Sequence, residues 1–194
     1  MAAGKKNAAR LRAHLVFLDE SGFMMAPLVR RSWAKRSCTP VLYQRGRSHE
    51  KVSAIAALCV APCRSRLRLY FRLHRNENIR APLVVEFLRA LKRQLGTSIV
   101  IIWDRLAAHR SRAVKVFLKA HPRIRVEFLP PYAPELNPAE YVWSYLKHNP
   151  LANAPYYETI SLAASARCHT RRLQHKEELL RSFLRHSPLP LRLR

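Results

Sequence analysis

The sequence predicts an α/β fold in which a mixed β-sheet is flanked by helices. Three observations support this class. Apolar runs of strand length recur along the chain; two of them are separated only by a turn that contains proline; and the later runs alternate with segments whose apolar residues recur at helical spacing. Strands joined by a turn pair antiparallel and strands separated by a helix pair parallel, so the sheet is mixed.

The first half of the chain is predicted to contain three strands. Residues 14–18 (HLVFL) form an apolar run that stops at Asp19, as a strand buried on both faces would. Residues 51–60 form a second run. In residues 66–73 (RLRLYFRL) apolar and mainly basic side chains alternate, which indicates a strand with one buried face and one basic outer face. Because Pro62 lies between these last two strands, we expect them to pair antiparallel.

The second half is predicted to alternate helices with strands. The spacing of apolar residues from Val84 to Leu95 predicts a helix, with Pro82 near its start and Gly96 just past its end. The run SIVIIWD, which ends on Asp104, predicts a fourth strand. After it we expect a helix over 111–120, a strand over 124–129, a helix following the proline-rich segment PPYAPELNP, and a helical, basic C-terminal region.

Composition bounds the organisation and the partners of the chain. Its 194 residues suit one domain, with a basic arm (1–13), a core (14–150) and a helical extension of the same domain (151–194). The 36 Lys and Arg against 12 Asp and Glu give a net charge of +24, which favours polyanionic partners. No apolar run approaches the ~20 residues of a membrane helix. The four scattered cysteines suit reduced thiols, and we expect a cytoplasmic protein.

Asp19 and Asp104 are the only aspartates, and each follows a predicted buried strand. Ligands of open α/β sheets gather at the carboxyl ends of strands, so the two carboxylates meet at one rim if their strands are adjacent and parallel. Two carboxylates that close repel each other unless a cation or a proton lies between them, and oxygen ligands suit Mg²⁺ or Mn²⁺. The alternative, that each aspartate caps a turn, is weaker for two residues in the same topological position.

A third acidic ligand would complete a site for two metal ions, and Glu140 is the candidate. It lies in the first turn of the helix that follows PPYAPELNP. Spacing alone leaves a structural role equally open, because the segment from Asn137 to Glu140 has the pattern of an N-cap followed by a capping-box glutamate. Glu135 is a competing candidate. Glu20 would point to the face opposite Asp19 if the first strand continued.

Three segments, LDESGF, WDRLAAHR and LPPYAPELNPAEYVWSYLK, resemble in this order the catalytic domain of DDE transposases of the mariner superfamily, in the branch found in bacterial insertion sequences. RRSWAKRSCTPV and the stretch around GRSHEKVSAIAAL also resemble it, so the similarity runs from about residue 14 to the C-terminus. The resemblance implies a ribonuclease-H-like fold, which is a five-stranded mixed sheet flanked by helices. This agrees with the predicted order of elements.

The resemblance implies that Asp19, Asp104 and Glu140 are the catalytic residues and the ligands of Mg²⁺ or Mn²⁺, with two ions expected. It also implies an activity: cleavage of a DNA strand at the end of an insertion sequence, then transfer of that end to target DNA. His109 matches a histidine that recurs in the second segment. A contact to DNA, a place beside the active site and a buried, hydrogen-bonded role are all open for it.

The excess of basic residues suits binding of DNA phosphates without recognition of sequence. We expect DNA, with no membrane partner. Trp33 and Tyr132 could stack on exposed bases, and core packing is equally open for both. The third strand and its turn would add Arg64, Arg66, Arg68 and Arg72. The main DNA-binding residues are expected between and just at the first two strands: Arg30, Arg31, Lys35, Arg36, Arg45, Arg47 and Lys51.

Complete members of the family carry helix-turn-helix modules before the catalytic domain, whereas 13 residues precede the first predicted strand here. We expect either a truncated remnant or one product of a split reading frame, with a separately encoded helix-turn-helix partner and a homodimer or higher oligomer on DNA. Two alternatives to a transposase stay open. One is a nuclease of the same fold that cuts without joining, and the other is an inactive DNA-binding remnant.

Overall fold

The computed structural model describes residues 12–26, 28–43, 50–189, 191 and 193. Five strands form one sheet: β1 (His14–Met24), β2 (Lys51–Val60), β3 (Leu67–Arg75), β4 (Ile99–Trp103) and β5 (Ile124–Phe128). Their order in the sheet is β3-β2-β1-β4-β5. β1 pairs antiparallel with β2 and parallel with β4; β2 pairs antiparallel with β3, and β4 pairs parallel with β5. The predicted mixed sheet and the predicted order of elements are therefore confirmed.

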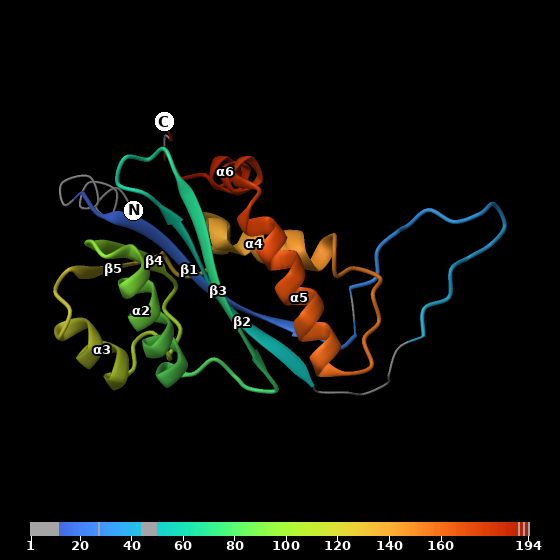
Figure 1. The fold of residues 1–194 in the computed structure, drawn as a ribbon, viewed down its shortest axis with the longest axis horizontal. Coiled ribbons are helices and arrows are strands. Elements are labelled where there is room, and N and C mark those ends of the chain that lie inside the picture. Colours follow the sequence, from blue (N-terminus) through green and yellow to red (C-terminus); the bar gives the residue numbers. More distant parts are fainter. Residues whose placement is uncertain (1–11, 27, 44–49, 190, 192, 194) are drawn as a thin grey trace.

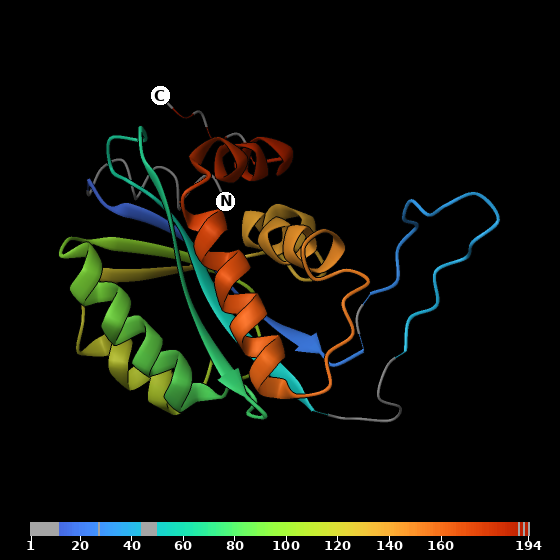
Figure 2. The same cartoon turned by 45° about the vertical axis from the view of Figure 1, so that its right-hand side comes forward.

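Helices cover both faces of the sheet (Figure 1). α2 (Ala81–Leu95) and α3 (Arg112–Lys119) lie on one face. α4 (Pro138–His148), α5 (Thr159–Gln174) and α6 (Glu177–His186) lie on the other, as the turned view of Figure 2 also shows. Successive side chains of a strand point to opposite faces, so β1 contributes Val16 and Leu18 to the core under α2 and α3, and Leu15 and Phe17 to the core under α4 to α6.

The ends of α2 follow from the residues that flank it. A proline occupies its first turn, where the absent N–H has no partner to lose. Gly96 ends the helix in the left-handed region, at φ 63°, and its N–H donates to the Lys92 carbonyl. The apolar residues from Val84 to Leu95 are the ones that α2 buries, as their spacing predicts.

β1 is longer than predicted. The polar sequence after Leu18 suggested that the strand stops at Asp19, but the structure continues it to Met24. The pairing with β2 explains the difference, since every residue from Asp19 (opposite Ala56) to Met24 (opposite Lys51) has a partner across the antiparallel ladder. A strand whose partner supplies the hydrogen bonds can carry polar residues that a local pattern assigns to a turn.

β3 also differs from the strand that its alternation predicted. Leu67 and Leu69 are buried, as expected. On the opposite face, Tyr70 packs against the core under α2, and Arg72 forms an ion pair with Glu86 of α2. The predicted basic outer face is therefore partly covered by a helix. A sequence pattern can indicate which face is polar, but not which helix packs over it.

Residues 28–43, between β1 and β2, extend away from the body of the fold (Figures 1 and 2). Hydrogen bonds hold the base of this projecting segment. The side chain of Asn153 makes two hydrogen bonds to the backbone of Arg30: Oδ1 accepts from its N–H at 2.7 Å, and Nδ2 donates to its carbonyl at 2.9 Å. The backbone N–H of Asn153 also donates to the Leu28 carbonyl. Tyr157 donates its hydroxyl to the Tyr43 carbonyl at 3.3 Å. The rest of the projecting segment is exposed to solvent.

Two expectations from composition concern membranes and thiols. Among the residues that the structure describes, no helix combines the length and the apolar character needed to cross a bilayer. Cys38, Cys59, Cys63 and Cys168 are all free thiols, as expected.

Candidate functional site

Asp19 and Asp104 lie side by side where β1 and β4 stop pairing. The last registered pair of these parallel strands is Phe17 with Ile102, so each aspartate lies two residues beyond it, at the same level of the sheet. Asp19 is in the middle of β1 rather than at its end, yet it lies at the end of the parallel pairing. The two aspartates therefore lie at one rim because β1 and β4 are adjacent and parallel, as expected; only the place of Asp19 within its strand differs from the prediction.

Asp19 is buried under α4. Its side chain points to the face of Phe17, where Trp143 of α4 donates its Nε1–H to Oδ2 at 2.8 Å. Among the described residues, Oδ1 receives no hydrogen bond. Burial raises the pKa of Asp19 well above its ordinary value, and the neighbouring carboxylates of Glu140 and Glu20 raise it further. A negative charge at Asp19 is therefore costly unless a cation compensates for it.

Asp104 is held by the Leu106 amide and by His109, whose Nδ1 hydrogen-bonds the Asp104 carbonyl at 3.2 Å. The backbone N–H of Leu106 donates to Oδ1 at 3.0 Å, and Nδ1 of His109 lies 2.8 Å from the same atom. No described residue donates to Oδ2. Burial raises the pKa of Asp104, but the hydrogen bonds from His109 and Leu106 outweigh it and lower the pKa overall. Asp104 is therefore the more readily ionised of the two aspartates.

Glu140 lies in the first turn of α4, and the structure tests the predicted capping box there. Asn137 is the N-cap, as predicted, and its Oδ1 accepts the Ala139 N–H at 3.2 Å. The backbone N–H of Asn137 donates to the Pro134 carbonyl at 2.8 Å, so the capping-box bond from Glu140 is replaced by a turn. The carboxylate of Glu140 lines the cavity instead. Burial raises its pKa and the charge of Asp104 adds to this rise, while Lys147 opposes it.

The three carboxylates line one cavity of about 500 Å³. They reach it from three separate elements, β1, the loop after β4 and the start of α4. Glu135, the competing candidate, is exposed on the short helix Pro134–Leu136 and is absent from this lining. The other lining residues come from both sides of the rim: Arg105, Leu106, Leu129, Pro130, Pro131, Tyr132, Ala133, Pro134 and Asn137.

His109 is buried next to this cavity and has no surface to offer to DNA, so the predicted DNA contact is wrong for it. Its ring stacks on Trp103, with centroids 4.1 Å apart and planes 5° from parallel. Its Nε2 lies 2.9 Å from Oε1 of Glu20, and its Nδ1 faces Asp104. Burial lowers the pKa of His109, but the hydrogen bonds and charges of both carboxylates raise it to about 10. The other two predicted roles of His109 agree with the structure, since it lies beside the cavity and is buried and hydrogen-bonded.

The predicted DNA-binding residues lie mainly outside the cavity. Lys51 is half-buried at the start of β2. Arg45 and Arg47 lie outside the described residues. Trp33 and Tyr132 are fully exposed, which removes core packing as their role. Tyr132 lines the cavity, whereas the projecting segment carries Trp33 together with the exposed Arg30, Arg31, Lys35 and Arg36.

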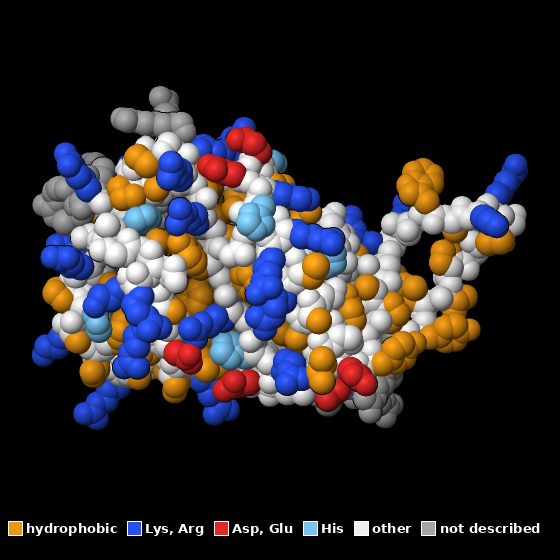
Figure 3. Space-filling model, viewed as in Figure 1, with side chains coloured by type: hydrophobic (Ala, Val, Ile, Leu, Met, Phe, Trp, Pro, Cys, Tyr) orange, Lys and Arg blue, Asp and Glu red, His pale blue; other side chains and the backbone are white. Residues whose placement is uncertain are grey.

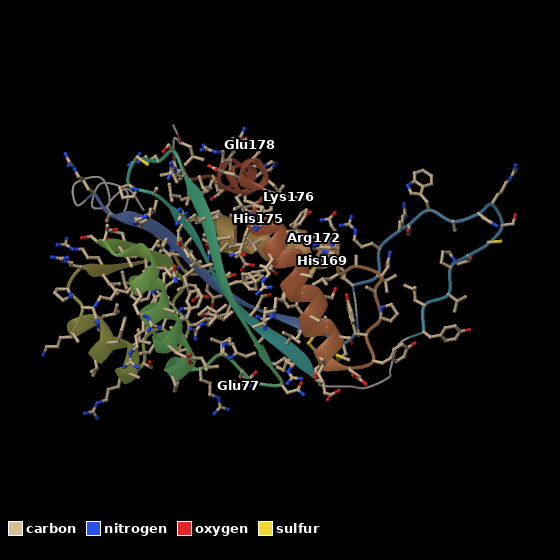
Figure 4. All side chains as sticks on the ribbon, viewed as in Figure 1. Glu77, His169, Arg172, His175, Lys176 and Glu178 are labelled. Atoms are coloured by element: carbon tan, nitrogen blue, oxygen red, sulfur yellow. The ribbon has the colours of Figure 1, made fainter. Side chains whose placement is uncertain are left out.

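Two basic features escaped prediction as parts of a site. Arg105 follows Asp104 directly and lines the cavity, with its guanidinium carbon 6.0 Å from the ring centroid of Phe128. Its position after the second aspartate was the available signal. The second feature is α5, which contains no acidic residue. Figure 4 shows His169, Arg172, His175 and Lys176 along α5 towards α6, and Figure 3 shows Lys and Arg side chains spread over this face with few acidic ones.

The donor set of the cavity suits a hard divalent cation. Three carboxylates supply oxygen atoms to the cavity. Each aspartate also keeps one oxygen that receives no hydrogen bond from the described residues. Within the part of the chain that the structure describes, no three acidic, histidine or cysteine side chains form a ready-made metal cluster. Burial, with added repulsion from neighbouring carboxylates, raises the pKa of Asp19 and of Glu140, and a bound cation offsets this kind of cost.

Comparison with known proteins gives a family match over most of the chain. The family model described as "DDE superfamily endonuclease" matches residues 14–163. A protein of Sinorhizobium fredii (strain NBRC 101917 / NGR234), named "Uncharacterized protein y4pE/y4sA", is 41% identical over 58 residues, which cover 30% of this chain and 40% of that protein.

Solved structures of Mos1 transposase have a similar fold. The Mos1 paired-end complex with the left transposon end matches with a TM-score of 0.64 and 18% identity, over 96% of this chain and 54% of that chain. The Mos1 catalytic domain with raltegravir and Mn matches with a TM-score of 0.58 and 16% identity, over 95% and 80%. Mos1 paired-end complexes have been solved with Mn and with Mg. The likeness shows the ribonuclease-H-like fold, and this chain spans about half the length of the Mos1 chain in the paired-end complex.

Proposed function

Because the chain belongs to the DDE superfamily endonuclease family, we propose that it is the catalytic domain of a transposase that cleaves DNA strands at the ends of an insertion sequence and joins them to target DNA. One observation carries the proposal: Asp19, Asp104 and Glu140, from three separate elements, line one cavity at the end of the β1–β4 pairing. An acidic cavity in a chain of net charge +24 suits a role that needs cations and a polyanion together.

In this proposal Asp19, Asp104 and Glu140 hold two ions of Mg²⁺ or Mn²⁺. When bound, such cations supply positive charge at the attacking and leaving oxygens of an in-line phosphoryl displacement. The residues around the cavity hold the carboxylates in place. Trp143 fixes one oxygen of Asp19, and the Leu106 amide and His109 fix one oxygen of Asp104.

Positive side chains would bring the phosphate to this cavity. Arg105 lines it and is exposed, so its guanidinium can receive the phosphate beside the bond that breaks. The basic residues of the projecting segment and of α5 would bind flanking phosphates without recognising sequence. Tyr132, exposed at the cavity, would stack on a base next to the cleaved bond.

Recognition of the transposon ends would need more than this chain. Mos1 has been solved as a complex with a transposon end, and this chain spans about half of that Mos1 chain. We propose that a helix-turn-helix module, on a separate protein or on a longer form of this one, reads the terminal sequence. The active assembly on DNA would be a homodimer or a higher oligomer, located in the cytoplasm at the bacterial nucleoid.

The test compares cleavage, joining and binding in one set of proteins. We expect Asp104→Asn to reduce Mn²⁺-dependent cleavage of DNA from the ends flanking this gene by about a thousandfold or more. Its DNA affinity at fixed salt should stay within about twofold, because Asp104 contacts no phosphate in this account. Glu135→Gln, a change of an exposed acid outside the cavity, is the control and should cleave normally. Full cleavage by Asp104→Asn would refute the site. Cleavage by the unchanged chain without joining of pre-cut ends would favour a simple nuclease.

A further inference from the structure

Glu20, His109 and Asp104 form a continuous chain of polar contacts beside the cavity. Nε2 of His109 lies 2.9 Å and 3.1 Å from the two oxygens of Glu20, and Nδ1 lies 2.8 Å from Oδ1 of Asp104. Glu20 comes from β1 and Asp104 from the loop after β4, and Glu20 is on the face of β1 opposite to Asp19. The histidine therefore connects a carboxylate outside the cavity to one that lines it.

The geometry requires both ring nitrogens of His109 to donate. Ionised carboxylates and backbone carbonyls accept hydrogen bonds and cannot donate them; Nε2 faces the Glu20 carboxylate, and Nδ1 faces both the carbonyl and the carboxylate of Asp104. The ring has little freedom to turn away, because it is 2% exposed and stacks on Trp103 at 4.1 Å. Glu20 is itself largely covered, with 12% of its side chain exposed, so His109 is its local source of positive charge.

We propose that Glu20 and His109 are positioning residues that fix the orientation of the Asp104 carboxylate for cation binding. The Leu106 amide donates to Oδ1, and Nδ1 of His109 lies 2.8 Å from the same oxygen in an ion-pair contact while it hydrogen-bonds the Asp104 carbonyl at 3.2 Å. That arrangement sets the rotation of the carboxylate and leaves Oδ2 for a ligand in the cavity. Glu20 acts one step further away, because it holds the opposite nitrogen of the ring. Partners of this kind orient metal ligands, and their loss lowers metal affinity by about 10- to 100-fold. The inference rests on the proposed function, which makes Asp104 a cation ligand.

The decisive test uses two amide replacements of His109 in the full chain. Both remove the ring and its stacking on Trp103, so both should lower the melting temperature by a similar amount. Asparagine places its amide nitrogen where Nδ1 was and can still donate to Asp104. Glutamine places its nitrogen where Nε2 was and can donate only towards Glu20. Mn²⁺ is titrated into each protein without DNA, and the dissociation constant is measured by calorimetry. We expect His109→Asn to stay within about threefold of the unchanged chain and His109→Gln to weaken by about 10- to 100-fold.

The Glu20 arm is tested in the same way. Glu20→Gln keeps an oxygen that accepts from Nε2, and Glu20→Ala removes it. We expect the alanine variant to bind Mn²⁺ more weakly than the glutamine variant. Glu86→Gln on α2, which breaks the ion pair with Arg72 of β3, is the control for loss of a surface charge and should leave Mn²⁺ binding unchanged.

The outcomes separate this inference from the proposed function. If both His109 variants lose Mn²⁺ affinity equally, in step with their melting temperatures, the histidine is only structural and the inference fails. If the unchanged chain binds Mn²⁺ and loses this binding with Asp104→Asn, the proposed site stands in either case. If the unchanged chain takes up no Mn²⁺, both the site and the inference are refuted.

Discussion

At the cavity, Asp19 is 6% exposed and receives a hydrogen bond from Trp143, while the Leu106 amide and His109 hold Asp104. In the projecting segment, Trp33 is fully exposed and its basic neighbours reach into solvent. The two regions place their charges differently because they meet different demands. Groups that orient a small ion must be fixed before it binds. Groups that follow a long polyanion gain from staying hydrated and adaptable.

The largest difference between the two regions should appear in tryptophan replacements. Trp103 is fully buried in the core under α2 and α3 and stacks on His109. Trp103→Ala should lower the free energy of unfolding by about 3–5 kcal/mol. Trp33→Ala should change it by less than about 0.5 kcal/mol. Denaturant unfolding of both variants measures this. Equal losses would mean that the projecting segment packs against the body of the fold.

The pH dependence of stability should report the bridge from Glu20 to Asp104. The folded-state pKa of His109 is raised to about 10 from its ordinary 6.5, so the folded state holds this proton more tightly than the unfolded state. The stabilisation is then fully present below about pH 6.5 and is lost as the pH rises through 10. The free energy of unfolding, measured across this pH range, should fall in the unchanged chain and should fall by a smaller amount in His109→Asn. Parallel curves would contradict the charged bridge.

Replacing Asp19 should stabilise the protein, whereas replacing a buried residue usually destabilises it. Its pKa is raised well above the usual value by burial and by the charges of Glu140 and Glu20, so its ionised form destabilises the chain when no cation is bound. Asp19→Asn keeps an oxygen that accepts from Trp143. In the presence of a chelator at pH 8 we expect it to stabilise the protein by about 0.5–2 kcal/mol. A clear loss of stability would mean that the carboxylate is already compensated within the fold.

The smallest effect on stability is expected in the projecting segment. Replacing Arg30, Arg31, Lys35 and Arg36 together by alanine should leave the melting temperature and Mn²⁺ binding unchanged. If all four bind phosphates, the slope of log affinity for DNA against log salt should become less steep by about 3–4. The matched control replaces three arginines and one lysine that are exposed on α2 and α3: Arg89, Arg93, Arg112 and Lys119. An unchanged slope would mean that DNA passes elsewhere, with α5 the next surface to examine.

Local patterns predicted most elements because each carries its own periodicity or cap. α4 shows this well: Asn137 caps it and Pro138 opens it, as the sequence indicates. The length of β1 could not be predicted in the same way, since the bonds that extend it come from β2, more than 25 residues further along the chain. Polar residues such as Glu20 look like the start of a turn until that partner is known.

The candidate site, like the fold, could be predicted only in part from the sequence. The meeting of Asp19 and Asp104 follows from strand order, which the alternation of helices and strands suggests. The absence of a capping box at Glu140 could be seen only in the structure, where the Asn137 N–H donates to the Pro134 carbonyl. The bridge through His109 joins residues 89 positions apart, and no spacing in the sequence reports such a contact.

The central claim is that three carboxylates from separate elements act as one cation site. Its most direct test is Mn²⁺ titration, followed by calorimetry, of the unchanged chain and of Asp19→Asn, Asp104→Asn and Glu140→Gln, with Glu135→Gln as the control from the same region. The account predicts that each cavity variant weakens binding by at least about tenfold and that the control binds as the unchanged chain does. Undiminished binding in any of the three cavity variants would contradict it.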